Sequence, residues 1–268
     1  MIIIRLLQHL TTYKLVALTF FALILIGAVL LMLPAASAGV ESLSFVDALF
    51  TATSAVCVTG LVVVDTGTYF TTFGQIVIIV LIQLGGLGVM TFATLISVAI
   101  GKRINLRERL LIQEALNQET VSGVVRMVLH IIKYTFCIEF IFGSILAFHF
   151  YPMYGERALY MGYWHSVSAF CNAGFDLFGN YDSLTKFADD GVVNFCIMSL
   201  ITLGGLGFIV MDDVLTKRRF KSLTVHSKVV ILASAALVLA GAVIFSLIDL
   251  NNPNTLANPS YADQRLAS

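Results

Sequence analysis

Charged residues are scarce in this 268-residue chain, at 12% against roughly 25% in a typical soluble domain. Apolar residues make up 58% of the sequence, and the mean hydropathy is +0.92. The 16 basic and 16 acidic residues balance, so the net charge indicates no class of partner. This composition excludes an ordinary soluble domain and predicts an all-α integral membrane protein, because apolar helices satisfy their own backbone hydrogen bonds in lipid.

Cysteine is equally scarce, with four residues and neither a CxxC pair nor any metal-ligand spacing among them. We find no Ser/His/Asp or Cys/His arrangement that would support catalysis, so we do not expect an enzyme. The basic clusters are short and adjoin apolar runs, which gives no support to nucleic-acid binding. The remaining sequence patterns indicate how the chain is arranged in a membrane.

The most informative pattern is a duplication. The octets at 54–61 and 168–175 share Ser, Ala, Cys and Gly at four of their eight positions, always 114 residues apart. A long apolar segment follows each octet and carries Gly-Gly-Leu-Gly, at 85–88 and again at 204–207. We interpret the chain as a tandem repeat. The glycine tetrapeptides are expected to allow close helix packing rather than to bind a nucleotide, because the strand that a dinucleotide loop needs is missing.

Each repeat is expected to consist of a helix, a short half-helix that re-enters the membrane, an extended return and a second helix. The segments before the octets are too short to span a bilayer as helices. The predicted organisation begins with a cytoplasmic N-terminus at 1–14 and repeat 1 at 15–100, which has its re-entrant half-helix and turn at 45–61. A cytoplasmic link at 101–123 leads to repeat 2 at 124–211, which has its half-helix and turn at 158–175. A second cytoplasmic link at 212–228, the first helix of a third repeat at 229–248 and an extracellular tail at 249–268 follow.

Charge distribution favours re-entry over crossing for the two short segments. If they crossed, the basic clusters at 102–109 and 217–221 would lie on opposite sides of the membrane. If they re-enter, both clusters lie with the basic N-terminus, and the other side (34–73 and 152–190) holds two basic residues against eight acidic ones. The positive-inside rule supports the second topology, with a cytoplasmic N-terminus.

A re-entrant turn leaves backbone carbonyls without helical partners, and in a water-filled cavity such carbonyls can replace the hydration shell of a cation. Glycine permits the dihedral angles that this requires. The side chains differ between the two octets while the backbone pattern persists, as expected if carbonyls are the ligands. The candidate ion-binding residues are Cys57, Val58, Thr59, Gly60, Cys171, Asn172, Ala173 and Gly174. The alternative is a duplicated helix hairpin with a glycine turn that binds no ion.

The expected membrane spans are 15–33, 74–100, 124–151, 191–211 and 229–248. A polar helical segment is expected at 101–123 and a loop at 152–157. Glu139 lies inside the third expected span. An ionisable residue at membrane depth is a functional hypothesis by default. Two interpretations stay open from the sequence: a structural hydrogen bond or ion pair, and a role in the pore.

At these residues the chain resembles the Trk/Ktr/HKT superfamily of potassium transporters, most closely the KtrB-type bacterial membrane subunit. The resemblance rests on Asp47 through Leu61 with Val64-Asp65-Thr66, on His165 through Phe175, and on both glycine tetrapeptides. It implies four membrane–pore–membrane repeats around one pore, with Gly60 and Gly174 as filter glycines. It further implies potassium as the transported substrate, with sodium as a second candidate ion, in the bacterial cell membrane.

The resemblance also implies partners beyond membrane lipid. The pore subunit of the family forms a homodimer on a cytoplasmic ring of KtrA/TrkA-type regulatory subunits, and that ring, not this chain, binds ATP, ADP or NAD. The sequence departs from the family pattern because it holds two complete repeats and the first helix of a third. We expect either a fragment or two chains that combine their halves. The alternative function is a non-transporting membrane scaffold that docks a cytoplasmic regulator through 101–123 and 212–228.

Overall fold

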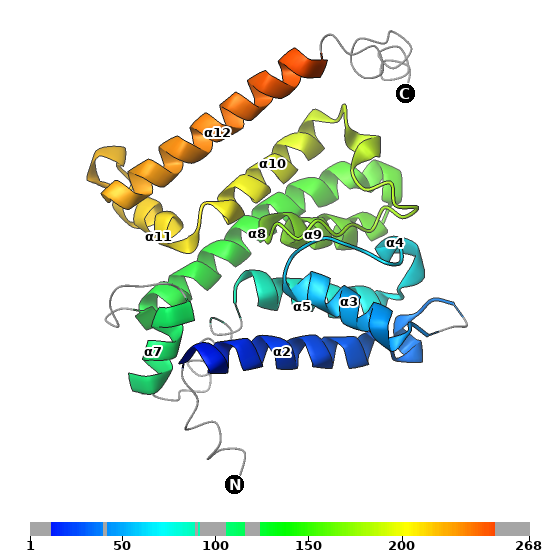
Figure 1. The fold of residues 1–268 in the computed structure, drawn as a ribbon. Helices are drawn as coiled ribbons and strands as arrows, with labels where there is room; N and C mark the ends of the chain where they lie inside the picture. Colours follow the sequence, from blue (N-terminus) through cyan, green and yellow to red (C-terminus); the bar gives the residue numbers. More distant parts are fainter. Residues whose placement is uncertain (1–11, 40–41, 89–90, 92–105, 116–123, 250–268) are drawn as a thin grey trace. The chain divides into compact units, whose positions relative to one another are not determined.

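The computed structural model describes residues 12–39, 42–88, 91, 106–115 and 124–249 (Figure 1). Throughout these residues the regular structure is helical, apart from an isolated bridge between Ser37 and Phe70. The all-α class is therefore confirmed. The helices are α2 (Thr12–Leu31), η1 (Pro34–Ala36), α3 (Phe45–Val56), α4 (Thr66–Tyr69), α5 (Thr72–Gly86), α7 (Leu106–Ala115), α8 (Val124–Tyr154), α9 (Arg157–Phe170), η2 (Thr185–Phe187), α10 (Gly191–Gly205), α11 (Phe208–Lys217), η3 (Phe220–Ser222) and α12 (Val225–Asp249).

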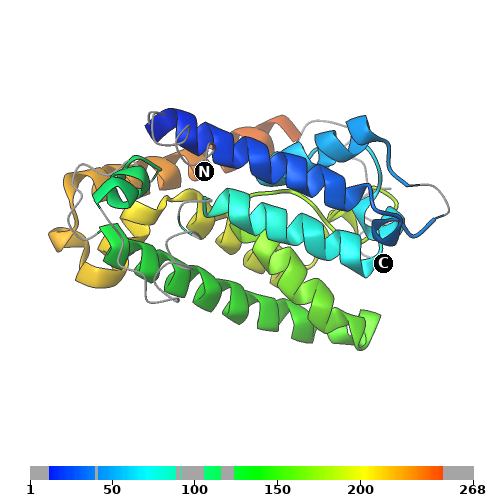
Figure 2. The same cartoon turned by 90° about the horizontal axis from the view of Figure 1, so that it is seen from below.

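The chain divides into two units, Met1–Gly205 and Leu206–Ser268. In the first unit, α2, α3 and α5 pack on one another, and α8, α9 and α10 form a second group of the same kind. Figure 2 shows α2 and α5 running side by side. Contacts between α5 and α9 join the two groups. Each group thus contains a short helix, α3 or α9, packed against longer apolar ones. The second unit contains α11, η3 and α12.

Local sequence explains where the first short helix and its successors begin. The Ser44 hydroxyl accepts a hydrogen bond from the Asp47 backbone N–H, which caps α3. Asp65 caps α4 through the Thr68 N–H at 2.8 Å, and Thr71 caps α5. These three caps divide the segment between 44 and 72 into a half-helix, a return and a new helix.

Length and composition allow two described helices to cross a membrane, Val125–Tyr154 and Val225–Ile244, and a third if α10 and α11 count as one interrupted span. Shorter apolar helices are Val16–Leu31, Phe45–Val56 and Thr72–Gly86. The first of these falls within the first expected span, at 15–33, and the last begins the second, at 74–100; residues 89–90 and 92–100 of that span lie outside the described residues.

Two helices end at positions that differ from the sequence-based boundaries. Helix α8 continues through Pro152 to Tyr154, where we expected a loop, because a proline in the last turn removes little of the hydrogen-bond ladder. Helix α10 ends at Gly205 instead of continuing to Met211, and a new helix begins at Phe208. Gly207 between them has a φ of +86°, and Gly88, which follows α5, has a φ of +82°.

Several expected segments lie wholly or partly outside the described residues. Of the N-terminal segment 1–14 only 12–14 are described, and of the tail 249–268 only Asp249. Of the link 101–123 the structure describes 106–115, which form α7 as the sequence predicted. The expected link at 212–228 contains the end of α11 and the 3-10 helix η3.

Candidate functional site

The two half-helices end at equivalent positions. Helix α3 ends at Val56 and α9 at Phe170, one residue before Cys57 and Cys171 respectively. From these cysteines onward the backbone is not helical. The sequence predicted a non-helical turn over each whole octet, but the structure keeps the first three residues of each octet in the half-helix.

The turns that follow have the same backbone conformation in both copies. Val58 and Asn172 have φ of 51° and 58°, and Gly60 and Gly174 have φ of 74° and 75°. Each pair is separated by 114 residues. A glycine adopts this region without penalty, whereas it is uncommon for valine. The duplication is therefore retained in backbone geometry even where the side chains differ.

The hydrogen bonds of the two turns also match. The N–H groups of Cys57, Val58 and Thr59 donate back to the carbonyls of α3, at 2.8, 3.3 and 2.9 Å. The N–H groups of the equivalent residues in the second copy donate back to α9 at 3.0, 3.0 and 2.8 Å. Within the described part of the chain, no hydrogen bond ends on the carbonyl oxygens of 57–60 or of 171–174. Three donors of each turn are thus paired, whereas the four carbonyl oxygens accept no hydrogen bond from the described residues.

The two turns meet at their glycines. A Cβ added to Gly60 would lie 2.5 Å from the Ala173 carbonyl oxygen and 3.2 Å from the Gly174 Cα. A Cβ added to Gly174 would lie 3.4 Å from the Gly60 Cα. Segments 114 residues apart thus approach at backbone contact, and a side chain at Gly60 would both strain the backbone and collide with the second turn.

The Gly-Gly-Leu-Gly segments pack against the ends of the half-helices, directly before the turns. A Cβ on Gly85 would overlap the Val56 carbonyl oxygen, and a Cβ on Gly204 would overlap that of Phe170. Each first glycine therefore lets a long helix contact the C-terminal end of the half-helix in its own copy. This confirms the close-packing interpretation of these segments.

The second glycine of the first tetrapeptide makes a contact between copies. The Cβ position of Gly86 lies 2.7 Å from the Cys171 Sγ, and Cys171 is buried. Its counterpart Cys57 is exposed. The counterpart of Gly86, Gly205, has only the Asn172 side-chain nitrogen near its Cβ position, at 3.8 Å. The second turn is thus covered by the first copy, and the first turn has no equivalent cover in the described part of the chain.

Glu139 lies in α8, buried, at 4% exposure. The Gln83 side-chain nitrogen donates to both of its carboxyl oxygens, at 2.9 and 3.2 Å, and the Cys171 thiol lies 3.6 Å from the Gln83 side-chain oxygen. The Ser166 hydroxyl donates to the Glu139 carbonyl at 2.9 Å. Glu139 is therefore connected to the second turn through Gln83 and does not itself form part of it.

A cavity of about 310 Å³ lies beside the second turn. It is lined by residues of α9, of the turn, of the following loop and of α10, among them His165, Asn172, Gly174, Asp176 and Ile197. Burial raises the pKa of Asp176, and the nearby charges of Asp65 and Asp182 raise it further, against the lowering effect of the Phe178 N–H. The cavity thus combines an apolar wall with a carboxyl group next to the second turn.

The sequence analysis missed two amides in α5 that organise the site. The Gln75 side chain donates to the carbonyls of Thr66, Gly67 and Phe70 and accepts from the Tyr160 hydroxyl. Gln83 holds Glu139, as described above. The available signal was a pair of polar side chains eight residues apart within an otherwise apolar run.

Comparison with known proteins gives a consistent picture. The family model described as "TrkH: Cation transport protein" matches residues 7–249. The Ktr system potassium uptake protein B of Bacillus subtilis is 45% identical over 259 residues, which cover 96% of this chain and 57% of that protein. The potassium/sodium uptake protein NtpJ of Enterococcus hirae is 41% identical, over 98% of this chain and 58% of its own length. The Ktr system potassium uptake protein B of Vibrio alginolyticus is 41% identical, over 95% and 56%.

Proposed function

The chain belongs to the TrkH family of cation transport proteins, and on this premise we propose that it forms part of the pore of a potassium transporter. Transport, not catalysis, is the activity of this family. Potassium ions would pass down their electrochemical gradient through a filter lined by backbone carbonyls. The filter residues are those of the two turns: Cys57, Val58, Thr59, Gly60, Cys171, Asn172, Ala173 and Gly174.

One observation carries the proposal: in both turns the first three N–H groups bond back to the half-helix, and among the described residues no hydrogen bond reaches the carbonyl oxygens of 57–60 and 171–174. Unpaired carbonyls at membrane depth cost several kcal/mol each unless water or an ion receives them. A dehydrated monovalent cation is such a partner. The backbone contact between Gly60 and Gly174 supports the inference that the two sets of oxygens face one site.

The names of the relatives support potassium as the substrate and sodium as the competing ion. Two of them are described as potassium uptake proteins and one as a potassium/sodium uptake protein. The chain spans somewhat more than half the length of these relatives. We therefore propose conduction for the assembly in which this chain takes part, with further filter strands from additional repeats or from a second copy.

The same proposal includes the setting of the chain. We infer a bacterial cell membrane with the N-terminus cytoplasmic, since the positive-inside bias supports it. The Ktr relatives are named as components of a system, which supports a KtrA/TrkA-type regulatory partner on the cytoplasmic side. Homodimerisation belongs to the proposal as well.

Gly174→Ser in the complete transporter tests the filter. We expect it to reduce the preference for potassium over sodium, because a side chain at φ 75° shifts the carbonyls of the turn. The measurement is rubidium or potassium uptake, with sodium as competitor, in a bacterial host without its own potassium uptake. Gly191→Ser is the matched control, since a Cβ there meets nothing within 4 Å.

Unchanged uptake kinetics and selectivity in Gly174→Ser would contradict the filter assignment. The same host separates the alternative function: a chain that is produced in the membrane, binds a regulator and supports no uptake in any assembly acts as a scaffold.

A further inference from the structure

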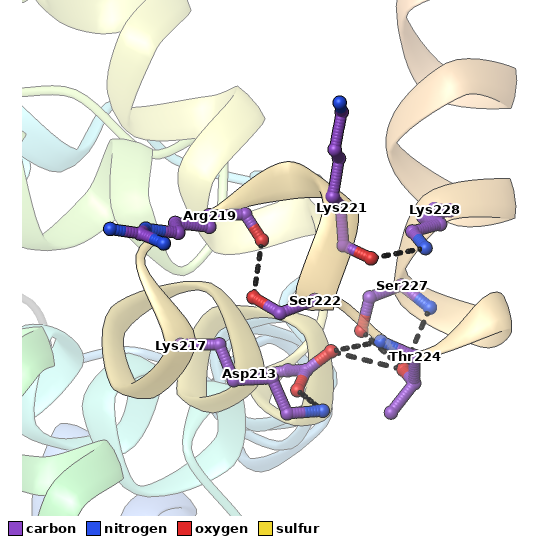
Figure 3. Close-up of polar contacts among 8 residues, drawn as sticks. All are labelled: Asp213, Lys217, Arg219, Lys221, Ser222, Thr224, Ser227 and Lys228. Atoms are coloured by element: carbon purple, nitrogen blue, oxygen red, sulfur yellow. Dashed lines mark hydrogen bonds and ion pairs between the residues drawn. The ribbon is translucent and has the colours of Figure 1, made fainter.

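The turn between α11 and α12, residues 218–224, is held in place by one carboxylate. The Asp213 side chain accepts hydrogen bonds from the Thr224 N–H at 2.9 Å and from its hydroxyl at 3.0 Å, and it pairs with Lys217 at 2.6 Å (Figure 3). These contacts hold the pKa of Asp213 well below its usual range despite the opposing effect of desolvation. The end of α11 is thereby tied to the first residue before α12.

Three cations of this turn are left uncompensated. Lys217 has its carboxylate partner, whereas the structure gives Arg218, Arg219 and Lys221 no carboxylate within ion-pair distance among the residues it describes. All three side chains are exposed. The main chain beneath them is fixed, because the Lys228 ammonium donates to the Lys221 carbonyl at 2.9 Å and the Ser222 hydroxyl donates to that of Arg219 at 2.7 Å. The backbone that carries these charges therefore has a defined position.

The same turn adjoins an apolar span. The segment Val225–Ile244 is long and apolar enough to cross a membrane, and it begins four residues after Lys221. Phe220, between Arg219 and Lys221, is 50% exposed. Figure 3 shows the Lys221 side chain extending alongside α12 in the direction in which that helix runs. A lysine that precedes a span and extends along its first turns brings its ammonium to the level of the lipid headgroups.

We propose that the turn binds the phosphate headgroup of an anionic phospholipid in the leaflet where α12 begins. Lys221 and Arg219 supply the charge, and the exposed Phe220 ring inserts at the interface. Basic residues next to a span attract anionic lipid in this way. A cytoplasmic regulatory protein is the competing occupant. Lipid is favoured because the turn is short, is tied to the start of the span and directs a lysine along it.

The test measures lipid binding to the purified full chain, with fluorescent short-chain phosphatidylglycerol and with phosphatidylcholine as probes. Removing each cation is expected to weaken phosphatidylglycerol binding roughly fivefold, so Arg219→Gln/Lys221→Gln together weaken it about 25-fold. Phosphatidylcholine binding stays unchanged. Lys186→Gln is the control, because it removes an exposed lysine that already pairs with Asp182. Thermal stability in detergent checks that the Asp213 contacts persist.

Three results would overturn the proposal. One is unchanged phosphatidylglycerol binding in the double variant. Another is an equal loss of binding for phosphatidylglycerol and phosphatidylcholine, which would show that the headgroup charge does not determine binding. The third is binding of another occupant. Displacement of the lipid by millimolar inorganic phosphate would assign the turn to a free anion, and a selective loss of regulatory-protein binding in the double variant would assign it to a protein. Lipid binding is measured without ion flux, so failure here leaves the filter assignment standing.

Discussion

Val58 and Asn172 occupy the same place in the two turns, in the left-handed region of the backbone. This region costs an ordinary L-residue about 1–2 kcal/mol, and asparagine tolerates it better than valine does. The second copy therefore carries a residue that fits the conformation, and the first carries one that resists it. A backbone that is kept despite a β-branched residue is held by its surroundings, here the three N–H bonds back to α3.

Exchanging these residues gives a prediction in two directions. Asn172→Val is expected to lower the free energy of unfolding by about 1 kcal/mol, whereas Val58→Asn is expected to leave it unchanged or to raise it by a similar amount. Thermal unfolding of the purified protein in detergent measures both. Equal destabilisation by the two substitutions would indicate that side-chain packing, not backbone conformation, dominates at these positions.

Among the helices, α5 is the one through which the two copies communicate. Its Gln83 reaches Glu139 in α8 and Cys171 in the second turn, and its Gln75 reaches the return of the first copy and Tyr160 in α9. An amide has a donor and an acceptor end, so one side chain can link two elements in a region without water. The position of the second turn thus depends on a helix of the first copy.

Gln83→Leu tests this dependence. It removes the donor to a buried carboxyl group, which is expected to cost about 1–3 kcal/mol of stability. We also expect reduced selectivity for potassium, because the thiol of Cys171, one of the proposed filter residues, loses its acceptor. Glu139→Gln is the conservative comparison, since an amide still accepts a hydrogen bond from Gln83. If Gln83→Leu lowered stability without changing ion selectivity, the link would be structural only.

Sequence patterns predicted the order of helices and the two turns, because composition, charge and repetition are local or periodic signals. They did not predict the break after Gly205, since Leu206, Phe208 and Ile209 continue the apolar run that a helix would need. The link between Gln83 and Glu139 was also beyond reach, because it joins residues 56 positions apart through packing alone. The helical role of Pro152 was missed because a proline near a helix end is equally compatible with a loop.

At the scale of the whole first unit, Asp65 joins the outer loops of the two copies. Its carboxylate accepts the Tyr181 N–H at 2.7 Å and caps α4 through Thr68. Burial alone would raise the pKa of Asp65, but these hydrogen bonds outweigh it and lower the pKa below the usual range of an aspartate. The contrasting group is Asp176, whose pKa is raised by burial and by neighbouring carboxylates.

These opposite shifts predict opposite effects on stability. A lowered pKa contributes stability that is present above the unfolded value and is lost as the pH falls through the folded one. Asp65→Asn is therefore expected to lower stability at pH 7 and to flatten its decline below about pH 4. For Asp176 the protonated form is favoured in the fold, so Asp176→Asn is expected to raise stability at pH 7. Thermal unfolding from pH 3 to pH 7 compares both variants with the parent. A destabilised Asp176→Asn at neutral pH would contradict the prediction.

The contact between Gly86 and Cys171 gives the duplicated chain a direction. One copy screens the thiol of the next, so the two sulfurs are unequal although their flanking sequences agree: Cys171 is shielded and Cys57 is open. An arrangement of this kind has a leading edge and a trailing edge, as in any head-to-tail ring. Repeats that join through such edges must follow one another in the same rotational sense around the ring. The different accessibility of the Cys57 and Cys171 thiols shows which edge of the chain is already covered by another repeat.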